Sequence, residues 1–271
     1  MKATKIERSN RTRIVATACV VLLVALGVGA LLVYDKLKAV YLEQCVVTDM
    51  ASQVEITSGK MVPASTIAEE LKLRVGANLA LIDFPAERQR LLEKVPNLRA
   101  VRISRRLPGK VIVVAEERTP VARMELRGRA GISGRVVDTE GVVFVWQRGT
   151  QTLPAIREAL PPGTARGQRI ARRTLAALRL IEACREPDFL EIGILEVDVS
   201  KPDFLLATLS NYSKLKITWA DMDEQTPASQ NDLRARLANL LKAMRSRVSP
   251  ETVVWNATMP DTIFADTQGK L

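Results

Sequence analysis

The stretch GANLALIDFPAERQRLLEKVPNLRAVRISRRLPGKVIVVAEERTPVAR, residues 76–123, decides the fold of the first folded part of this chain. It opens with a helix signal, because Asp83 can cap a helix and Pro96 ends it. Two strands are then expected, since residues 101–104 alternate between apolar and polar, and residues 110–116 are rich in β-branched side chains. This stretch therefore predicts a helix followed by two strands.

Upstream of this stretch, the chain supplies one more strand and one more helix. Residues 53–57 predict a strand that ends at a Ser-Gly turn. Thr66 with Glu69 three residues later forms a capping box, so a helix is expected to begin there and to end near Leu73. The order β-α-α-β-β predicts an α+β domain in which two helices cover one face of a three-stranded sheet.

The same residues resemble the POTRA domain of the FtsQ/DivIB bacterial cell-division proteins. That family has a Gly-x-Asn-Leu-x-x-Ile-Asp element, a helix ending in Leu-x-x-x-Pro, two strands and a closing Glu-Arg-x-Pro-Val-Ala. The chain matches this pattern at Gly76, Asn78, Leu79, Ile82, Asp83, Pro96, Ala100, Val101, Pro108, Glu117, Arg118, Pro120, Val121 and Ala122. The resemblance implies a POTRA domain at residues 52–119.

Further towards the N-terminus lies the uncharged run IVATACVVLLVALGVGALLVY, from Ile14 through Val24 to Tyr34. At about 1.5 Å per helical residue it reaches roughly 30 Å, the thickness of the hydrocarbon core of a bilayer. It predicts one transmembrane helix at residues 14–34. A cleaved signal peptide is the alternative, but the apolar run continues beyond the small residues 27–30.

The charges around this run predict its orientation. Residues 1–13 hold five basic residues against one acid, whereas the charges after Tyr34 nearly cancel. By the positive-inside rule, residues 1–13 form a cytoplasmic tail, and the chain is a single-pass type II protein of the cell (inner) membrane. Residues 35–51 are expected to form a juxtamembrane stalk, with the bulk of the chain outside the cytoplasm.

Residues 120–271 predict a second domain, a mostly antiparallel β-sheet with two helices. The expected elements are a hairpin at 136–144, a helix at 169–183, strands at 192–199, 204–209 and 215–219, a helix that opens at Ser229 with Asp232, and strands at 252–256 and 262–265. On this helix, Arg234, Arg236, Lys242 and Arg245 are expected to face solvent. This part resembles the β domain that follows POTRA in FtsQ.

The amino-acid composition argues against several classes of function. The formal net charge is +10, of which +4 belongs to residues 1–13, and no basic run is interleaved with aromatic residues, so we expect no nucleic-acid binding. Histidine is absent, which removes the usual general base and the commonest metal ligand, and we expect neither metal nor cofactor. Cys45 and Cys184 are expected to be two separate thiols rather than a disulfide.

Two other function classes remain as alternatives. An enzyme would have to use carboxylate pairs such as Asp138 with Glu140 or Asp221 with Asp223, yet both pairs lie in turn-like sequence, so we expect no catalytic residues. Carboxylates converging in a cleft would support a hydrolase. A POTRA-containing accessory of protein export or envelope assembly is the other alternative, although residues 120–271 are too short for a transmembrane barrel.

The resemblance implies a scaffold of the cell-division machinery at the division septum, with other divisome membrane proteins as partners. In FtsQ-like proteins, FtsB and FtsL add a strand to the last strands of the β domain. Carried over by position, the partner-binding residues are Val253, Trp255, Thr262, Ile263, Phe264 and Ala265. A second contact surface, for lipid headgroups or another divisome protein, is Arg102, Arg105 and Arg106, within a basic group that includes Arg99 and Lys110.

Overall fold

The computed structural model describes residues 3–106, 108–126, 134–147, 149–160, 166–224, 226–246 and 254–267, with only the main chain at 3–20, 126 and 158–160. The chain divides into two compact units. The first comprises Met1–Thr57, Ala64–Leu91 and Val101–Val114, and the second comprises Ser58–Pro63, Leu92–Ala100 and Ala115–Leu271.

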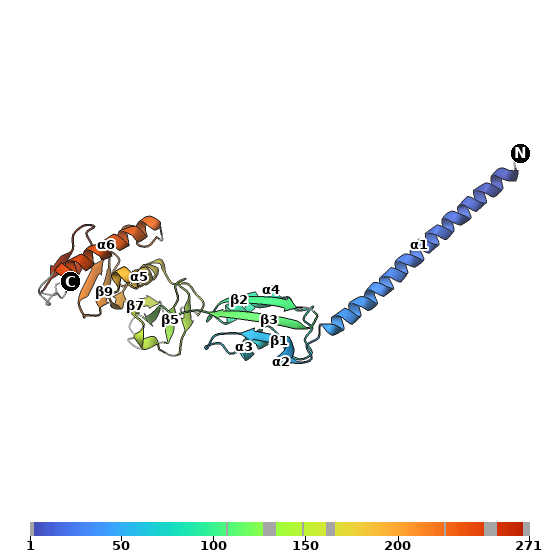
Figure 1. Ribbon diagram of the computed structural model, residues 1–271. Coiled ribbons are helices and arrows are strands. Elements are labelled where there is room, and N and C mark those ends of the chain that lie inside the picture. Colours follow the sequence, from blue (N-terminus) through green and yellow to red (C-terminus); the bar gives the residue numbers. More distant parts are fainter. Residues whose placement is uncertain are drawn as a thin grey trace. The chain divides into compact units, whose positions relative to one another are not determined.

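In the first unit, α1 (Ala3–Gln44) is one uninterrupted helix of 42 residues (Figure 1). It contains the predicted transmembrane segment, and the large apolar side chains from Val21 to Tyr34 are each more than half exposed. When only the residues with described side chains are considered, no helix is both long enough and apolar enough to cross a membrane. The predicted segment begins at Ile14, where the main chain alone is described.

The end of α1 is tied to the folded part of the first unit. Val47 N donates to the carbonyl of Ala77, and Gly76 N donates to the carbonyl of Val47, both at 2.8 Å. Gly76 has a φ of 85°, which glycine adopts without strain. Asn78 Nδ2 donates to the Leu42 carbonyl at 2.8 Å and so caps the last turn of α1. The predicted stalk is therefore helical up to Gln44 and then joins the folded unit.

A three-stranded sheet with two main helices follows α1, as the order β-α-α-β-β predicts (Figure 1). Its elements are α2 (Met50–Gln53), β1 (Val54–Thr57), α3 (Ala64–Glu70), α4 (Phe84–Lys94), β2 (Leu98–Arg106) and β3 (Lys110–Glu117). The strand order is β1-β3-β2, with β1 parallel to β3. The helices bury Ile67 and Leu91, and the strands bury Val111 and Val113, so the apolar periodicity of the sequence forms one core.

The local helix signals of this part have mixed outcomes. Asp83 Oδ1 accepts the Ala86 N–H at 3.2 Å, so the predicted cap of α4 is confirmed. The predicted capping box is wrong, because α3 begins at Ala64 and Thr66 lies inside its first turn. The chain enters this helix directly after Pro63, whose ring fixes φ close to the helical value.

The closing Glu-Arg pair of the POTRA pattern has a structural role in the second unit. The Glu117 carboxylate accepts the main-chain N–H groups of residues 60–62 at 2.7–3.1 Å. The Arg118 guanidinium donates to the Pro96 carbonyl and to the carboxylates of Asp138 and Glu140. The Glu117 bonds hold the end of β3 against residues 60–62, and the Arg118 bonds connect it with Pro96 and with the hairpin that follows.

The second unit is built on a nine-stranded sheet of order β12-β11-β10-β9-β8-β7-β4-β5-β6. The strands are β4 (Ala122–Leu126), β5 (Arg135–Val137), β6 (Val143–Val145), β7 (Ala155–Leu160), β8 (Ile194–Asp198), β9 (Leu205–Leu209), β10 (Lys214–Ile217), β11 (Val254–Ala257) and β12 (Phe264–Asp266). The helices are α5 (Arg172–Ala183) and α6 (Pro227–Ser246), with short 3-10 turns η1 (Thr150–Thr152) and η2 (Pro187–Phe189). The pairs β4–β7, β7–β8 and β10–β11 are parallel, so the sheet is mixed although mostly antiparallel.

The helices α5 and α6 lie against one face of this sheet (Figure 1). Leu178 of α5 and Leu237 of α6 are fully buried in one core with the inward-facing strand residues Val197, Ala207 and Leu215. Alternate strand residues point away from the helices, which leaves the other face of the sheet as the more exposed one.

Several predicted boundaries in this part need correction. Helix α6 begins at Pro227 rather than Ser229, because Thr226 Oγ1 accepts the Ser229 N–H at 3.1 Å and proline suits the first helical position. Arg236, predicted to face solvent, is 5% exposed. The strands β4 and β7 were not predicted.

Candidate partner-binding edge

The terminal strand β12 lies at one end of the nine-stranded sheet and pairs only on one side within the described part of the chain. Its partner β11 is antiparallel to it, with Asn256 opposite Phe264 and Trp255 opposite Ala265. Because β11 is enclosed by β10 and β12, its main chain is paired on both sides. The outward N–H and C=O groups of β12 therefore form the free edge.

The predicted binding residues lie in different surroundings near this edge. Phe264 is 55% exposed and Ala265 is also exposed, and both lie in β12. Thr262 and Ile263 precede the strand, and Ile263 is half-buried against the core. Trp255 is 5% exposed, so its side chain contributes to the core rather than to the outer surface. Val253 lies outside the described residues.

Phe264 belongs to the sheet face that the helices leave open. The pairing register places Phe264 beside Asn256, Lys216 and then Leu206 on successive strands. Lys216 Nζ lies 4.2 Å from the centroid of the Phe204 ring, a cation–π contact that keeps the ammonium group over the sheet. The surface next to the edge thus combines an exposed aromatic ring with a positive charge.

Arg236 of α6 anchors the connection between β11 and β12, a role that the sequence analysis missed. Its guanidinium donates to the main-chain carbonyls of Ala257 and Thr258 at 3.2 and 3.1 Å. Asp232 one helical turn earlier accepts from Arg236 Nε at 3.2 Å and from the Ala220 N–H at 2.7 Å. The spacing of Asp232 and Arg236 signals an ion pair on the helix, but such pairs are usually exposed.

The basic residues of the POTRA sheet do not form a single cluster. Arg102 and Arg106 are exposed on β2. Arg105 donates to the Ile82 carbonyl, and its guanidinium lies 4.6 Å from the centroid of the Phe84 ring. Arg99, at the other end of β2, pairs with acidic side chains at 2.9 and 3.2 Å. Only the later part of β2 therefore offers unpaired positive charge.

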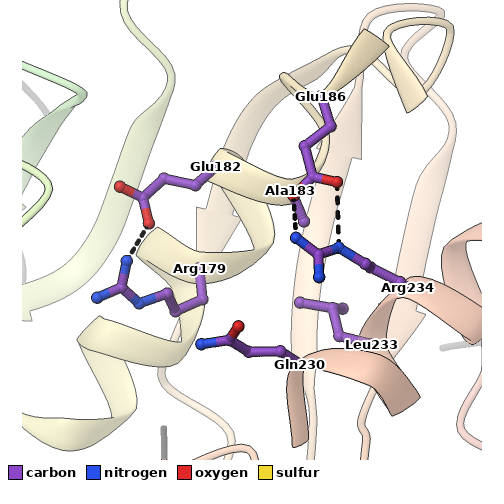
Figure 2. Close-up of a pocket in the computed structure, with 7 residues that line it drawn as sticks. All are labelled: Arg179, Glu182, Ala183, Glu186, Gln230, Leu233 and Arg234. Atoms are coloured by element: carbon purple, nitrogen blue, oxygen red, sulfur yellow. Dashed lines mark hydrogen bonds and ion pairs between the residues drawn. The ribbon is translucent and has the colours of Figure 1, made fainter. Parts of the chain in front are cut away.

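A small cleft of about 150 Å³ lies between α5 and α6 (Figure 2). The Arg234 guanidinium binds the Glu186 carboxylate through two bonds of 2.7 and 3.1 Å, and Arg179 pairs with Glu182. Burial raises the pKa of Glu182 above its ordinary value. Both carboxylates already have a positive partner, so the cleft is best explained as the packing seam of two helices.

The first members of the two carboxylate pairs considered for an enzyme, Asp138 and Asp221, lie in local turns. Asp138 is 3% exposed and accepts the N–H groups of Glu140 and Val142 at 3.0 and 2.9 Å. Asp221 has a φ of 50°, and its carbonyl accepts the Glu224 N–H at 2.8 Å. These contacts are those of local turns.

The cysteine thiols and the possible metal ligands give no sign of a reactive site in the described part of the chain. Cys45 and Cys184 are free and buried, as expected for two separate thiols. Burial raises the pKa of Cys184 to about 12, which keeps it a thiol at neutral pH. Within the described residues, no group of three or more histidine, cysteine, aspartate or glutamate side chains could hold a metal ion.

Comparison with known families agrees with the fold of residues 51–118, which match the model of the POTRA domain, FtsQ-type. No curated protein matches the chain. The matched residues run from α2 to Arg118 and so include the complete three-stranded sheet with α3 and α4. The resemblance drawn from the sequence is thereby confirmed for this part of the chain: residues 51–118 form a POTRA domain of the FtsQ type.

Proposed function

We propose that this protein is a single-pass membrane scaffold of the bacterial cell-division machinery. Its FtsQ-type POTRA domain indicates a role related to cell division and to protein–protein interaction. The scaffold binds other divisome membrane proteins, similar to FtsB and FtsL, and it works at the division septum. No step of catalysis is required for this role.

The edge of β12, which has no strand on its outer side within the described residues, is the observation that carries the proposal. A partner segment can extend the sheet there, because main-chain pairing supplies affinity and alternate side chains supply specificity. Phe264 and Ala265 are exposed on this strand, and Arg236 fixes the chain that leads into it. The edge is short, which limits unspecific pairing while the partner is absent.

The membrane anchor in this proposal is the segment from Ile14 to Tyr34. It contains no charged residue, and basic residues precede it. The described apolar side chains of α1 from Val21 onward are exposed. Apolar surface of this extent on a single helix is suited to a lipid environment.

A charge at Phe264 tests the binding edge. Phe264→Asp is expected to lower the affinity for the FtsB-like partner about tenfold or more, since exposed aromatic residues at interface centres often contribute above 1 kcal/mol. The measurement is co-purification of the full chain with the partner, followed by titration. Leu190→Asp is the matched control, because Leu190 is 63% exposed in the same unit but lies next to η2. Equal capture by both variants would contradict the proposed site.

Hydrogen exchange tests the pairing mode independently of side chains. Strand addition should protect the outward-facing amides among residues 264–266 when the partner binds, because each then donates to a new carbonyl. Amides of β10 should change little, since this strand is already paired on both sides. Partner binding without added protection of β12 would exclude strand addition.

A further inference from the structure

We propose that the tip of the β2–β3 hairpin, with Arg106 and the neighbouring Arg102 and Arg105, contacts anionic phospholipid headgroups of the membrane that holds α1. This surface is called the basic tip below. The inference rests on the proposed membrane anchor and adds a second attachment of the POTRA domain to the same membrane.

The structure places the turn that follows the basic residues of β2 beside the end of α1. A Cβ built on Gly109, in the turn between β2 and β3, would lie 3.9 Å from the main-chain oxygen of Gln44, the last residue of α1. The same position would lie 3.2 Å from Gln53 Nε2. The hairpin turn therefore lies next to the point where α1 enters the folded unit.

The connection between α1 and the POTRA fold is short and hydrogen-bonded. Asn78 binds the carbonyl of Leu42, and Leu79 N donates to the carbonyl of Cys45, both at 2.8 Å. Cys45 and Val47 are fully buried. Because no free linker separates the helix from the domain, the basic tip stays close to the helix end.

The length of helix beyond the anchor sets the distance to the membrane. From Tyr34 to Gln44, α1 rises about 15 Å at 1.5 Å per residue. The headgroup region occupies roughly the first 5–8 Å beyond the hydrocarbon core. The remaining gap between the end of α1 and the headgroups is about 10 Å, which is comparable to the Debye length at physiological salt. Long arginine side chains and tilt of the helix shorten this gap further.

The charge of the basic tip is largely uncompensated. Within the described part of the chain, neither Arg102 nor Arg106 has an acidic partner, and Arg105 binds a carbonyl and an aromatic ring rather than a carboxylate. Lys110 is offset by Glu55 at 3.0 Å. Lys36 and Lys38, exposed on α1 between the anchor and the tip, are balanced by the exposed Asp35 and Glu43 of the same stretch, so the positive charge on this side comes from the basic tip itself.

The acidic groups nearby do not cancel this charge. Glu43 is exposed near the end of α1, and the Asp49 carboxylate is engaged by Ala51 N, Ser52 N and Ser52 Oγ at the start of α2. A lipid surface fits the basic tip better than a protein, because the anchor itself delivers that surface to within reach of these charges.

The experiment uses the full chain reconstituted in vesicles of neutral phosphatidylcholine or of phosphatidylcholine with phosphatidylglycerol. A fluorophore on Ser104→Cys, in a Cys19→Ser background, reports distance to the surface by energy transfer to headgroup-labelled lipid. Ser104 is exposed on β2 between Arg102 and Arg106, and the native Cys45 and Cys184 are buried. Transfer is expected to be higher in anionic vesicles and to fall as salt is raised.

Neutralising the tip should remove this difference. Arg102→Gln with Arg106→Gln is expected to reduce the contact equilibrium about 30-fold, from the typical effect of two basic residues near an anionic surface. Arg172→Gln, an exposed arginine at the start of α5, is the matched control and should leave transfer unchanged.

The outcomes separate this inference from the proposed function. Failure of the chain to float with either kind of vesicle would refute the membrane anchor. Flotation with transfer that is insensitive to lipid charge would overturn the lipid contact while leaving the anchor intact. If the double variant instead loses co-purification with a divisome protein and keeps its transfer, the basic tip binds protein and the inference is wrong.

Discussion

Arg236 is a buried cation whose partners are main-chain carbonyls of the β11–β12 connection. Arg236→Met is expected to lower the free energy of unfolding by about 2–3 kcal/mol, because Asp232 and two carbonyls lose their donor. Urea denaturation of the purified full chain measures this loss. Arg234→Met is the control: its pair with Glu186 is exposed, so the expected cost is at most about 1 kcal/mol. Equal losses in the two variants would mean that the buried contacts of Arg236 contribute no more than a surface pair.

Glu140 makes the free energy of unfolding depend on pH in the acid range. Hydrogen bonds from Arg118 and Arg99 hold the pKa of the Glu140 carboxyl below its usual range. The unfolded chain then binds a proton more readily than the folded chain, so this stabilisation is present above about pH 4.3, the ordinary pKa of glutamate, and is lost as pH falls through the lowered pKa.

The variant Glu140→Gln tests this dependence. It should be less stable than the parent by about 1 kcal/mol at pH 7, a value reduced for the partial exposure of the side chain, and the two should converge at low pH. Denaturation midpoints at several pH values give the difference. A gap that persists unchanged in acid would show that the charge of Glu140 is not responsible.

At the scale of elements, the loop at residues 76–79 controls how firmly the end of α1 is held. Asn78→Ala removes the bond to the Leu42 carbonyl and should make local opening about fivefold more frequent, the effect of roughly 1 kcal/mol. The readout is maleimide labelling of Cys45, which is fully buried, in a Cys19→Ser background. Labelling of Cys184 on α5 is the internal control and should stay slow; equal acceleration at both thiols would indicate general destabilisation.

The elements that the sequence predicted correctly are those with local signals. Asp83 and Pro96 bound α4, alternation identified part of β2, and β-branched residues identified β3, because each feature depends on residues a few positions apart. Helix α6 was placed two residues late, since Ser229 and Thr226 both suit a cap and only the structure shows that the Ser229 hydroxyl binds Trp219 Nε1.

The features that were missed depend on distant parts of the chain. Strands β4 and β7 pair in parallel inside the sheet. The residues of one strand do not reveal that the other, about 30 positions away, is its neighbour. The burial of Arg236 follows from the path of residues 257–258, far along the sequence. The position of β12 at the sheet edge agrees with what the resemblance implied, whereas the burial of Trp255 had no local signal.

At the scale of the whole molecule, the proposed topology makes a direct prediction. A reporter that is active only in the cytoplasm should be silent when fused after Leu271 and active when fused ahead of residue 1. Replacing Val24 and Leu26 with lysine should shift the chain out of the membrane fraction, because each charge near the centre of a span costs about 2.5–3.5 kcal/mol. A silent N-terminal fusion together with an active C-terminal one would reverse the orientation.

The hydrogen bonds from Asn78 to Leu42 and from Leu79 to Cys45 make a rigid connection between α1 and the POTRA fold. In the proposed topology, a neighbour that turns the extracytoplasmic domain would also rotate the helix about its own axis. A different side of α1 would then face adjacent helices in the bilayer. Binding events outside the cytoplasm would in this way be transmitted to the cytoplasmic end of α1 as a rotation of the helix.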